Sequence, residues 1–125
     1  MQVSDHPIVH VEFASKEPSE ASRFYADLFG WQTMAMPVEG YGDYYGFRAE
    51  GGVGGGFPKV DGHGTNAGDV VVYVGTNDIN ASLAKATALG ATTLMPEMEV
   101  GGMGWMAIFQ DPTGNKVGLW KERQA

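Results

Sequence analysis

The chain has 125 residues, of which 43% are hydrophobic and 18% are charged. This length suits one domain with a sizeable core, and the hydrophobic share excludes wholesale disorder. Fifteen acidic against eight basic residues give a net charge of −7, which argues against nucleic acid or an anionic membrane surface as partner. Because the chain has no Cys, disulfides, thiolate metal sites and Cys nucleophiles are excluded.

The expected elements of the first half begin with a strand over Ile8–Phe13. Pro18 suits the first turn of a helix, and Gly30 suits the left-handed residue that ends it. Between them, apolar residues at Ala21, Phe24, Tyr25 and Leu28 form the stripe of an amphipathic helix. Three strands are expected to follow, over Trp31–Val38, Asp43–Ala49 and Val53–Phe57.

A polar, glycine-rich linker over Val60–Gly68 separates this half from a second one. Val70–Val74 predicts a strand, Asn77-Asp78 a helix start, and Gly90 the end of that helix. Asp111-Pro112-Thr113-Gly114 is typical of a type I turn. Three strands are expected around it, over Thr92–Met95, Met103–Phe109 and Lys116–Trp120, with an extension of the first past Pro96 left open.

The two halves share one order of elements, strand-helix-strand-strand-strand, which indicates an internal duplication. Phe13 matches Tyr73 and Gly30 matches Gly90 at an offset of 60, whereas Gly54 matches Gly118 at an offset of 64. We therefore predict an α+β fold of two tandem βαβββ modules that form a curved mixed sheet with a central cleft. The whole chain, residues 1–125, is one domain, with module one at about 6–58 and module two at about 69–121.

The chain holds 19 glycines, roughly twice the usual ~7%. They cluster at Gly51–Gly56, Gly62–Gly64 and Gly101–Gly104, and no cluster fits a phosphate-binding loop. Turns and close backbone approach in a β-rich protein are the expected explanation.

Three segments resemble the vicinal oxygen chelate superfamily, which includes glyoxalase I, extradiol dioxygenases and bleomycin-resistance proteins. They are Pro7–Phe13, Phe24–Trp31 and Asp111–Trp120. The resemblance spans nearly the whole chain and implies the paired βαβββ fold. It is less informative about activity, because the superfamily contains lyases, isomerases, dioxygenases, transferases and binding proteins.

Metal-dependent members of this superfamily hold one divalent ion with four residues. His10 matches the first of these positions, but the others fall on Gly54, on Val70 or Val71, and on Gly118. A single imidazole is a weak site, since catalytic metal centres usually have three protein ligands. We therefore expect no metal and no other cofactor, with a rebuilt site of His10, Glu12 and Asp69 as the alternative.

His10 and Glu12 share one face of their strand, where they can act as a general acid and base or orient a ligand. Seven further residues are candidates for the ligand-binding wall: Tyr45, Gly54, Gly56, Tyr73, Trp105, Gly118 and Trp120. Arg48 can pair with an anionic ligand group, although a solvated position is its ordinary explanation.

The function predicted first is small-molecule binding of the glyoxalase/bleomycin-resistance type, without the usual divalent metal. One alternative is a glyoxalase-like lyase or isomerase that uses His10 and Glu12, with or without a metal. Another is an accessory interaction domain without a ligand. The resemblance also implies a homodimer. The sequence shows no signal peptide and no apolar run near the ~20 residues of a membrane span, so we expect a cytoplasmic protein.

Overall fold

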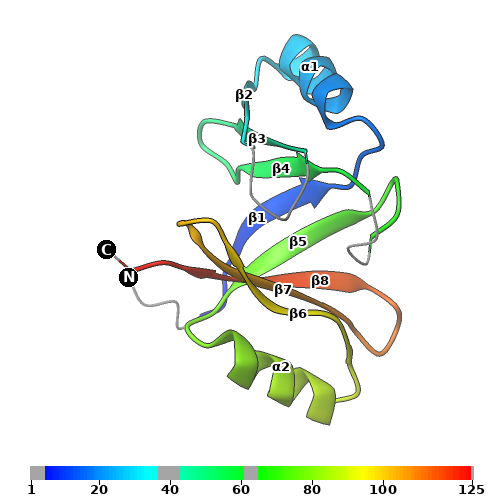
Figure 1. Ribbon diagram of the computed structural model, residues 1–125, viewed down its shortest axis with the longest axis vertical. Helices are drawn as coiled ribbons and strands as arrows, with labels where there is room; N and C mark the ends of the chain where they lie inside the picture. Colours follow the sequence, from blue (N-terminus) through cyan, green and yellow to red (C-terminus); the bar gives the residue numbers. More distant parts are fainter. Residues whose placement is uncertain (1–4, 37–42, 61–64, 125) are drawn as a thin grey trace. The chain divides into compact units, whose positions relative to one another are not determined.

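The computed structural model describes residues 5–36, 43–60 and 65–124. The chain divides into two compact units, one of His10–Val71 and one of Met1–Val9 with Val72–Ala125. We call them the first and the second module. Each contains one helix and the four strands of a βαβββ unit, so the predicted α+β fold of two such modules is confirmed (Figure 1).

The strands of the first module run in the spatial order β2-β3-β4-β1. Their bounds are Ile8–Phe13 for β1, Gln32–Ala35 for β2, Tyr44–Arg48 for β3 and Gly55–Pro58 for β4. β1 pairs with β4 in parallel and β3 pairs with β4 antiparallel, so Gly56 is in register with Glu12 on one side and Gly46 on the other. β2 is shorter than predicted, and positions 37–42, including Val38, lie outside the described residues.

Helix α1, Pro18–Phe29, covers one face of this sheet through a cluster of aromatic rings. Tyr25 stacks on Phe57 with ring centroids 5.6 Å apart and on Phe13 at 5.5 Å. Phe57 is fully buried. Gly30 ends the helix at a φ of 75°, as its glycine predicted. Because side chains alternate along a strand, Phe13 points toward α1 while His10 and Glu12 point to the opposite face.

The strands of the second module run in the order β5-β8-β7-β6. Their bounds are Val70–Gly75 for β5, Thr92–Val100 for β6, Gly104–Gln110 for β7 and Lys116–Glu122 for β8. Helix α2, Ile79–Ala88, begins with a cap in which the Asp78 carboxylate accepts from the Ala81 amide. Ile79 and Leu83 of α2 pack on Ala107 and Leu119, with Val74 at the edge of the cluster.

The predicted offset of 60 is wrong for the strands, although it holds for the glycines that follow the helices. Phe13 and Val74 are the residues that face the helices, so they correspond, at an offset of 61. Tyr73 lies on the other face and corresponds to Glu12. The helix caps explain the difference, because Glu17 and Asp78 are 61 residues apart whereas Gly30 and Gly90 are 60 apart. The segment from the N-cap residue to the glycine that follows the helix is thus one residue shorter in the second module.

The match of Gly54 with Gly118 is also wrong. Glu12 is in register with Gly56 and Tyr73 with Gly118. The structural counterpart of Gly118 is therefore Gly56, at an offset of 62. Neither helix, within the residues that the structure describes, is long and apolar enough to cross a lipid bilayer.

Candidate functional site

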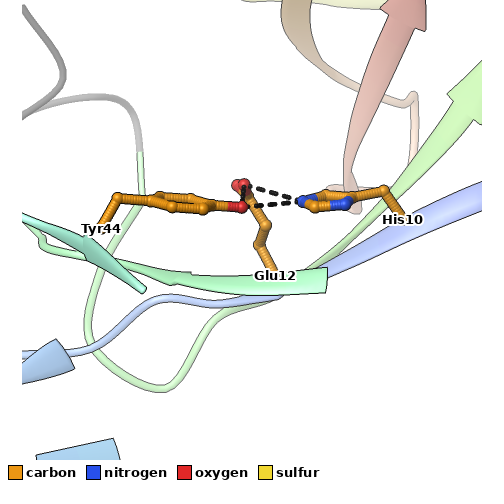
Figure 2. Close-up of polar contacts among 3 residues, drawn as sticks. All are labelled: His10, Glu12 and Tyr44. Atoms are coloured by element: carbon orange, nitrogen blue, oxygen red, sulfur yellow. Dashed lines mark hydrogen bonds and ion pairs between the residues drawn. The ribbon is translucent and has the colours of Figure 1, made fainter. Parts of the chain in front are cut away.

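Three polar side chains of the first module meet on the sheet face that points away from α1 (Figure 2). The Tyr44 hydroxyl donates to Glu12 Oε2 at 2.7 Å. His10 Nε2 lies 3.1 Å from the same oxygen and 2.9 Å from the Tyr44 hydroxyl. The three atoms therefore form a closed triangle of hydrogen bonds, which we call the His10–Glu12–Tyr44 cluster.

The strand order explains why a residue of β3 reaches residues of β1. β4 lies between them, and its residue in register with Glu12 is Gly56. A Cβ atom on Gly56 would stand 2.0 Å from the Tyr44 hydroxyl oxygen and 2.2 Å from the adjacent ring carbon. The Tyr44 side chain thus occupies the space above the bare backbone of Gly56 and passes over β4 to meet Glu12.

The hydrogen-bond pattern fixes the proton on His10. The single proton of the Tyr44 hydroxyl is donated to Glu12, so the contact between Tyr44 and His10 requires a proton on His10 Nε2. That N–H is shared between the Tyr44 oxygen and Glu12 Oε2. In this pattern Glu12 Oε2 accepts from both the Tyr44 hydroxyl and the His10 Nε2–H.

Burial differs across the cluster, and His10 is its most exposed member. The Glu12 side chain is 8% exposed and that of His10 is 31% exposed. Tyr44 is buried as well. A buried carboxylate that holds a half-exposed imidazole in one tautomer can orient that ring toward a ligand or take part in proton transfer with it.

The other predicted ligand-binding residues are spread over both modules. Gly54 accepts a backbone hydrogen bond from Val11 and so flanks His10, and Gly56 lies beneath Tyr44. Tyr45 alternates with Tyr44 and faces the side of the sheet on which Phe47 packs. The structure therefore gathers His10, Glu12, Gly54 and Gly56 in one place and leaves Tyr45 on the opposite face.

Of the second module's candidates, Tyr73 lies over Gly118, where a Cβ would be 2.3 Å from its ring. The Trp120 ring lies over Gly104 in the same way. Trp105 packs instead against the helix-facing core, with the Arg123 guanidinium 4.5 Å from its ring centroid.

Tyr44 was missed by the sequence analysis. The strand Asp43–Ala49 was expected, but nothing in the sequence fixed its register against β4. The signal that could have identified Tyr44 is the pair Gly46 and Gly56, since two facing glycines leave room for a large neighbour on one face.

The residues present do not fit the superfamily's metal site. Besides His10, the family positions carry glycine and valine, and the strand faces select Val71 rather than Val70 as the third. No group of three His, Asp or Glu able to hold an ion occurs in residues 5–36, 43–60 and 65–124. The Asp69 carboxylate of the alternative site accepts from the Asn66 amide at 2.7 Å and so holds a local turn.

Arg48 lines an open hollow of about 680 Å³ near the β3–β4 turn of the first module. Phe29 and Trp31 also line it, and so does the acidic Glu50. His10, Glu12 and Tyr44 are absent from its wall. The hollow therefore differs from the His10–Glu12–Tyr44 cluster, and its mixed charges select no ligand class.

Comparison with known proteins identifies the family. Residues 10–120 match the profile of the glyoxalase-like domain. The chain belongs to the glyoxalase-like domain family. This confirms the superfamily resemblance, and solved structures agree: methylmalonyl-CoA epimerase from Mycobacterium tuberculosis superposes with a TM-score of 0.71 at 12% identity, covering 99% of this chain and 92% of that one.

Curated relatives extend the comparison beyond the fold. A Mycobacterium tuberculosis protein named "Putative glyoxylase CFP32" is 32% identical over 114 residues, which cover 89% of this chain and 44% of the relative. The anthracycline biosynthesis protein DauV of Streptomyces sp. (strain C5) is 29% identical over 125 residues, covering 89% of this chain and 45% of the relative. The chain thus spans less than half the length of the curated relatives it matches.

Proposed function

We propose that this glyoxalase-like chain binds a small organic molecule at the His10–Glu12–Tyr44 cluster. The observation that carries the proposal is the buried Glu12 carboxylate, which accepts from Tyr44 and His10, while the His10 ring is the most exposed part of the cluster. Burying a carboxylate is costly without such donors. An arrangement that fixes one half-exposed imidazole so closely is better explained by ligand orientation than by core packing.

The family supports an organic ligand. A solved methylmalonyl-CoA epimerase with this fold is in complex with methylmalonyl-CoA, and two relatives carry the names of a glyoxylase and an anthracycline biosynthesis protein. These names concern those proteins, and they indicate the size and type of molecule to seek here. The chain's net charge of −7 favours a cationic or neutral ligand over an anion.

We also propose that binding requires no divalent metal, because Gly54, Gly56 and Gly118 have no side chain with which to coordinate an ion. The test is thermal unfolding with EDTA and with added Zn²⁺, Ni²⁺, Mn²⁺ or Fe²⁺. We expect the Tm to stay within about 2 °C, because only binding to the folded state raises stability. A saturable rise with one ion would overturn the metal-free part of the proposal.

The ligand itself is sought by native mass spectrometry of the purified protein. We expect a retained organic molecule whose occupancy falls in Glu12→Gln, since the amide keeps the shape of the side chain and loses its charge. Asn80→Ser, a change on the exposed start of α2, serves as the control and should keep full occupancy. Equal occupancy in Glu12→Gln and wild type would contradict a binding role for the cluster.

A second candidate is a glyoxalase-like lyase or isomerase. It is favoured by the contact of three groups that can exchange protons, within 3.1 Å of one another, an arrangement that can pass a proton between a ligand and the buried carboxylate. The molecule retained in native mass spectrometry would be incubated with the protein in D₂O. Deuterium on one of its carbons, lost in Glu12→Gln, would establish the enzyme. If the ligand gained no deuterium, the result would favour the binding protein over the enzyme.

We further propose a cytoplasmic homodimer. Phe24, Leu28 and Phe29 of α1 are each more than half exposed, which is a large apolar surface for one helix. Light scattering at micromolar concentration should give twice the monomer mass. A strict monomer would count against pairing and would leave the binding site proposal untouched.

A further inference from the structure

We infer that Tyr44 is a positioning residue of the candidate site. We further infer that Gly56 is its seat, by which we mean the glycine whose missing side chain leaves room for the Tyr44 ring. This inference rests on the proposed function, because it assigns further residues to the same site. Tyr44 holds the Glu12 carboxylate turned toward His10 and thereby keeps His10 in its Nε2–H tautomer. Gly56 permits this only because it has no side chain.

Geometry carries the first step. The hydrogen bond of 2.7 Å from the Tyr44 hydroxyl to Glu12 Oε2 is shorter than the 3.1 Å contact from His10, and both Tyr44 and Glu12 are buried. His10 contacts the same hydroxyl at 2.9 Å. Tyr44 therefore contacts both of the other members of the cluster, and removing its hydroxyl changes the surroundings of each.

Glycine carries the second step. A methyl group at Gly56 would overlap the hydroxyl, the ring carbon bearing it and a neighbouring ring carbon, at 2.0, 2.2 and 2.7 Å. Gly56 has no positive φ, so its backbone suits any residue and the space above it is the reason for a glycine. Gly56→Ala should therefore expel Tyr44 from the cluster without altering any of the three polar side chains.

The test is the nitrogen spectrum of the histidine ring in uniformly ¹⁵N-labelled protein, which needs no ligand. The His10 signals are assigned from their loss in His10→Gln. In the neutral ring we expect a protonated Nε2 and an unprotonated Nδ1. Tyr44→Phe and Gly56→Ala should each shift the His10 Nε2 resonance. A neutral His10 with its proton on Nδ1 would overturn the inference, and so would unchanged resonances in both variants.

A double-variant cycle separates positioning from simple loss of stability. Tyr44→Ala removes the ring that a methyl group at position 56 would strike. Adding Gly56→Ala to Tyr44→Ala should then leave the His10 spectrum and the Tm unchanged, whereas Gly56→Ala alone should lower the Tm by roughly 3–10 °C. An equal loss of Tm in both backgrounds would show that Gly56 serves something other than Tyr44.

Gly52→Ala is the matched control in the same module, because a Cβ there would meet only the Ala49 carbonyl oxygen, at 3.9 Å. It should leave the spectrum and the Tm as in wild type. These spectra also distinguish the two proposals. A proton on His10 Nε2 with no molecule retained in native mass spectrometry would contradict the proposed function and support the positioning role of Tyr44. A retained molecule with the proton on Nδ1 would support the proposed function and contradict the positioning role.

Discussion

The two modules have the same plan, yet they use the sheet face opposite their helices differently. In the first module the pair in register is Glu12 with Gly56, and the tyrosine over the glycine comes from β3. In the second it is Tyr73 with Gly118, and the tyrosine over the glycine stands on β5 itself. Both modules thus seat an aromatic ring on a bare backbone. Only in the first does a carboxylate take the position beside it.

This difference shows how a duplicated fold can confine chemistry to one copy. An aromatic ring needs space, and a glycine on the adjacent strand provides it in either module. When the first strand carries Glu12 instead of an aromatic residue, the ring from β3 brings a hydroxyl to that carboxylate. When it carries Tyr73, the same face is filled by packing, with Met106 and Ile108 buried nearby on alternate positions of β7.

The largest effect should come from the helix-facing core of the first module. Phe57 is fully buried, and the rings of Phe13, Tyr25 and Phe47 surround it. Phe57→Ala should lower the free energy of unfolding by about 3–5 kcal/mol. Urea unfolding measures it, with Met34→Ala, at a residue of β2 that is 61% exposed, as the control that should cost far less. Equal losses would contradict this description of the core.

The next effect tests the seat in the second module. Gly118→Ala should cost about 1–3 kcal/mol, because its methyl group would overlap the buried Tyr73 ring. Gly102→Ala is the matched control, since a Cβ there meets nothing within 4 Å. The His10 nitrogen resonances should stay unchanged in Gly118→Ala. If they moved as they do in Gly56→Ala, the two seats would not be independent.

The sequence predicted much of this fold because local signals were strong. Ile8–Phe13 and the helix from Pro18 to Gly30 were placed correctly, since alternation, the proline and the left-handed glycine are all local features. The strand predicted over Thr92–Met95, whose extension past Pro96 was left open, continues as β6 to Val100 with two irregularities in its pairing. The prediction failed where the position of a side chain depended on the register between strands.

The register between two strands, that is, which of their residues lie opposite each other, cannot be read from either strand alone. This limited the prediction of the site. His10 and Glu12 could be placed on one face because they lie two residues apart on one strand. Tyr44 was missed because its meeting with Glu12 requires β4 between them and a glycine at one position of β4. The wrong offset at Tyr73 has the same origin, since one residue fewer in the second helical segment reverses the face of everything matched across it.

An effect of similar size should follow from removing the carboxylate that distinguishes the first module. Glu12→Leu takes away the acceptor that Tyr44 and His10 share, and burying such donors without it costs about 1–3 kcal/mol. Glu12→Gln should cost less, because its carbonyl oxygen can still accept from both. Urea unfolding of the two variants checks this order. If Glu12→Gln failed to fold, the carboxylate would be structural, and its binding role would lose its support.

The smallest effect concerns the turns that precede the last strand of each module. In the second module, hydrogen bonds from the Asn115 side chain and backbone, with further ones from Thr113, hold the pKa of the Asp111 carboxyl well below its usual range. A carboxyl whose pKa is lowered on folding stabilises the protein above the unfolded-state pKa of about 4 and loses that contribution as the pH falls further. Asp111→Asn should therefore lower the Tm slightly at pH 7, and the difference from wild type should shrink toward pH 2. The corresponding turn of the first module is closed by a backbone hydrogen bond from the Gly52 amide to the Ala49 carbonyl. A difference at Asp111 that stayed constant from pH 7 to pH 2 would mean that the charge of this carboxylate contributes nothing, and that the two turns are held alike by their backbones.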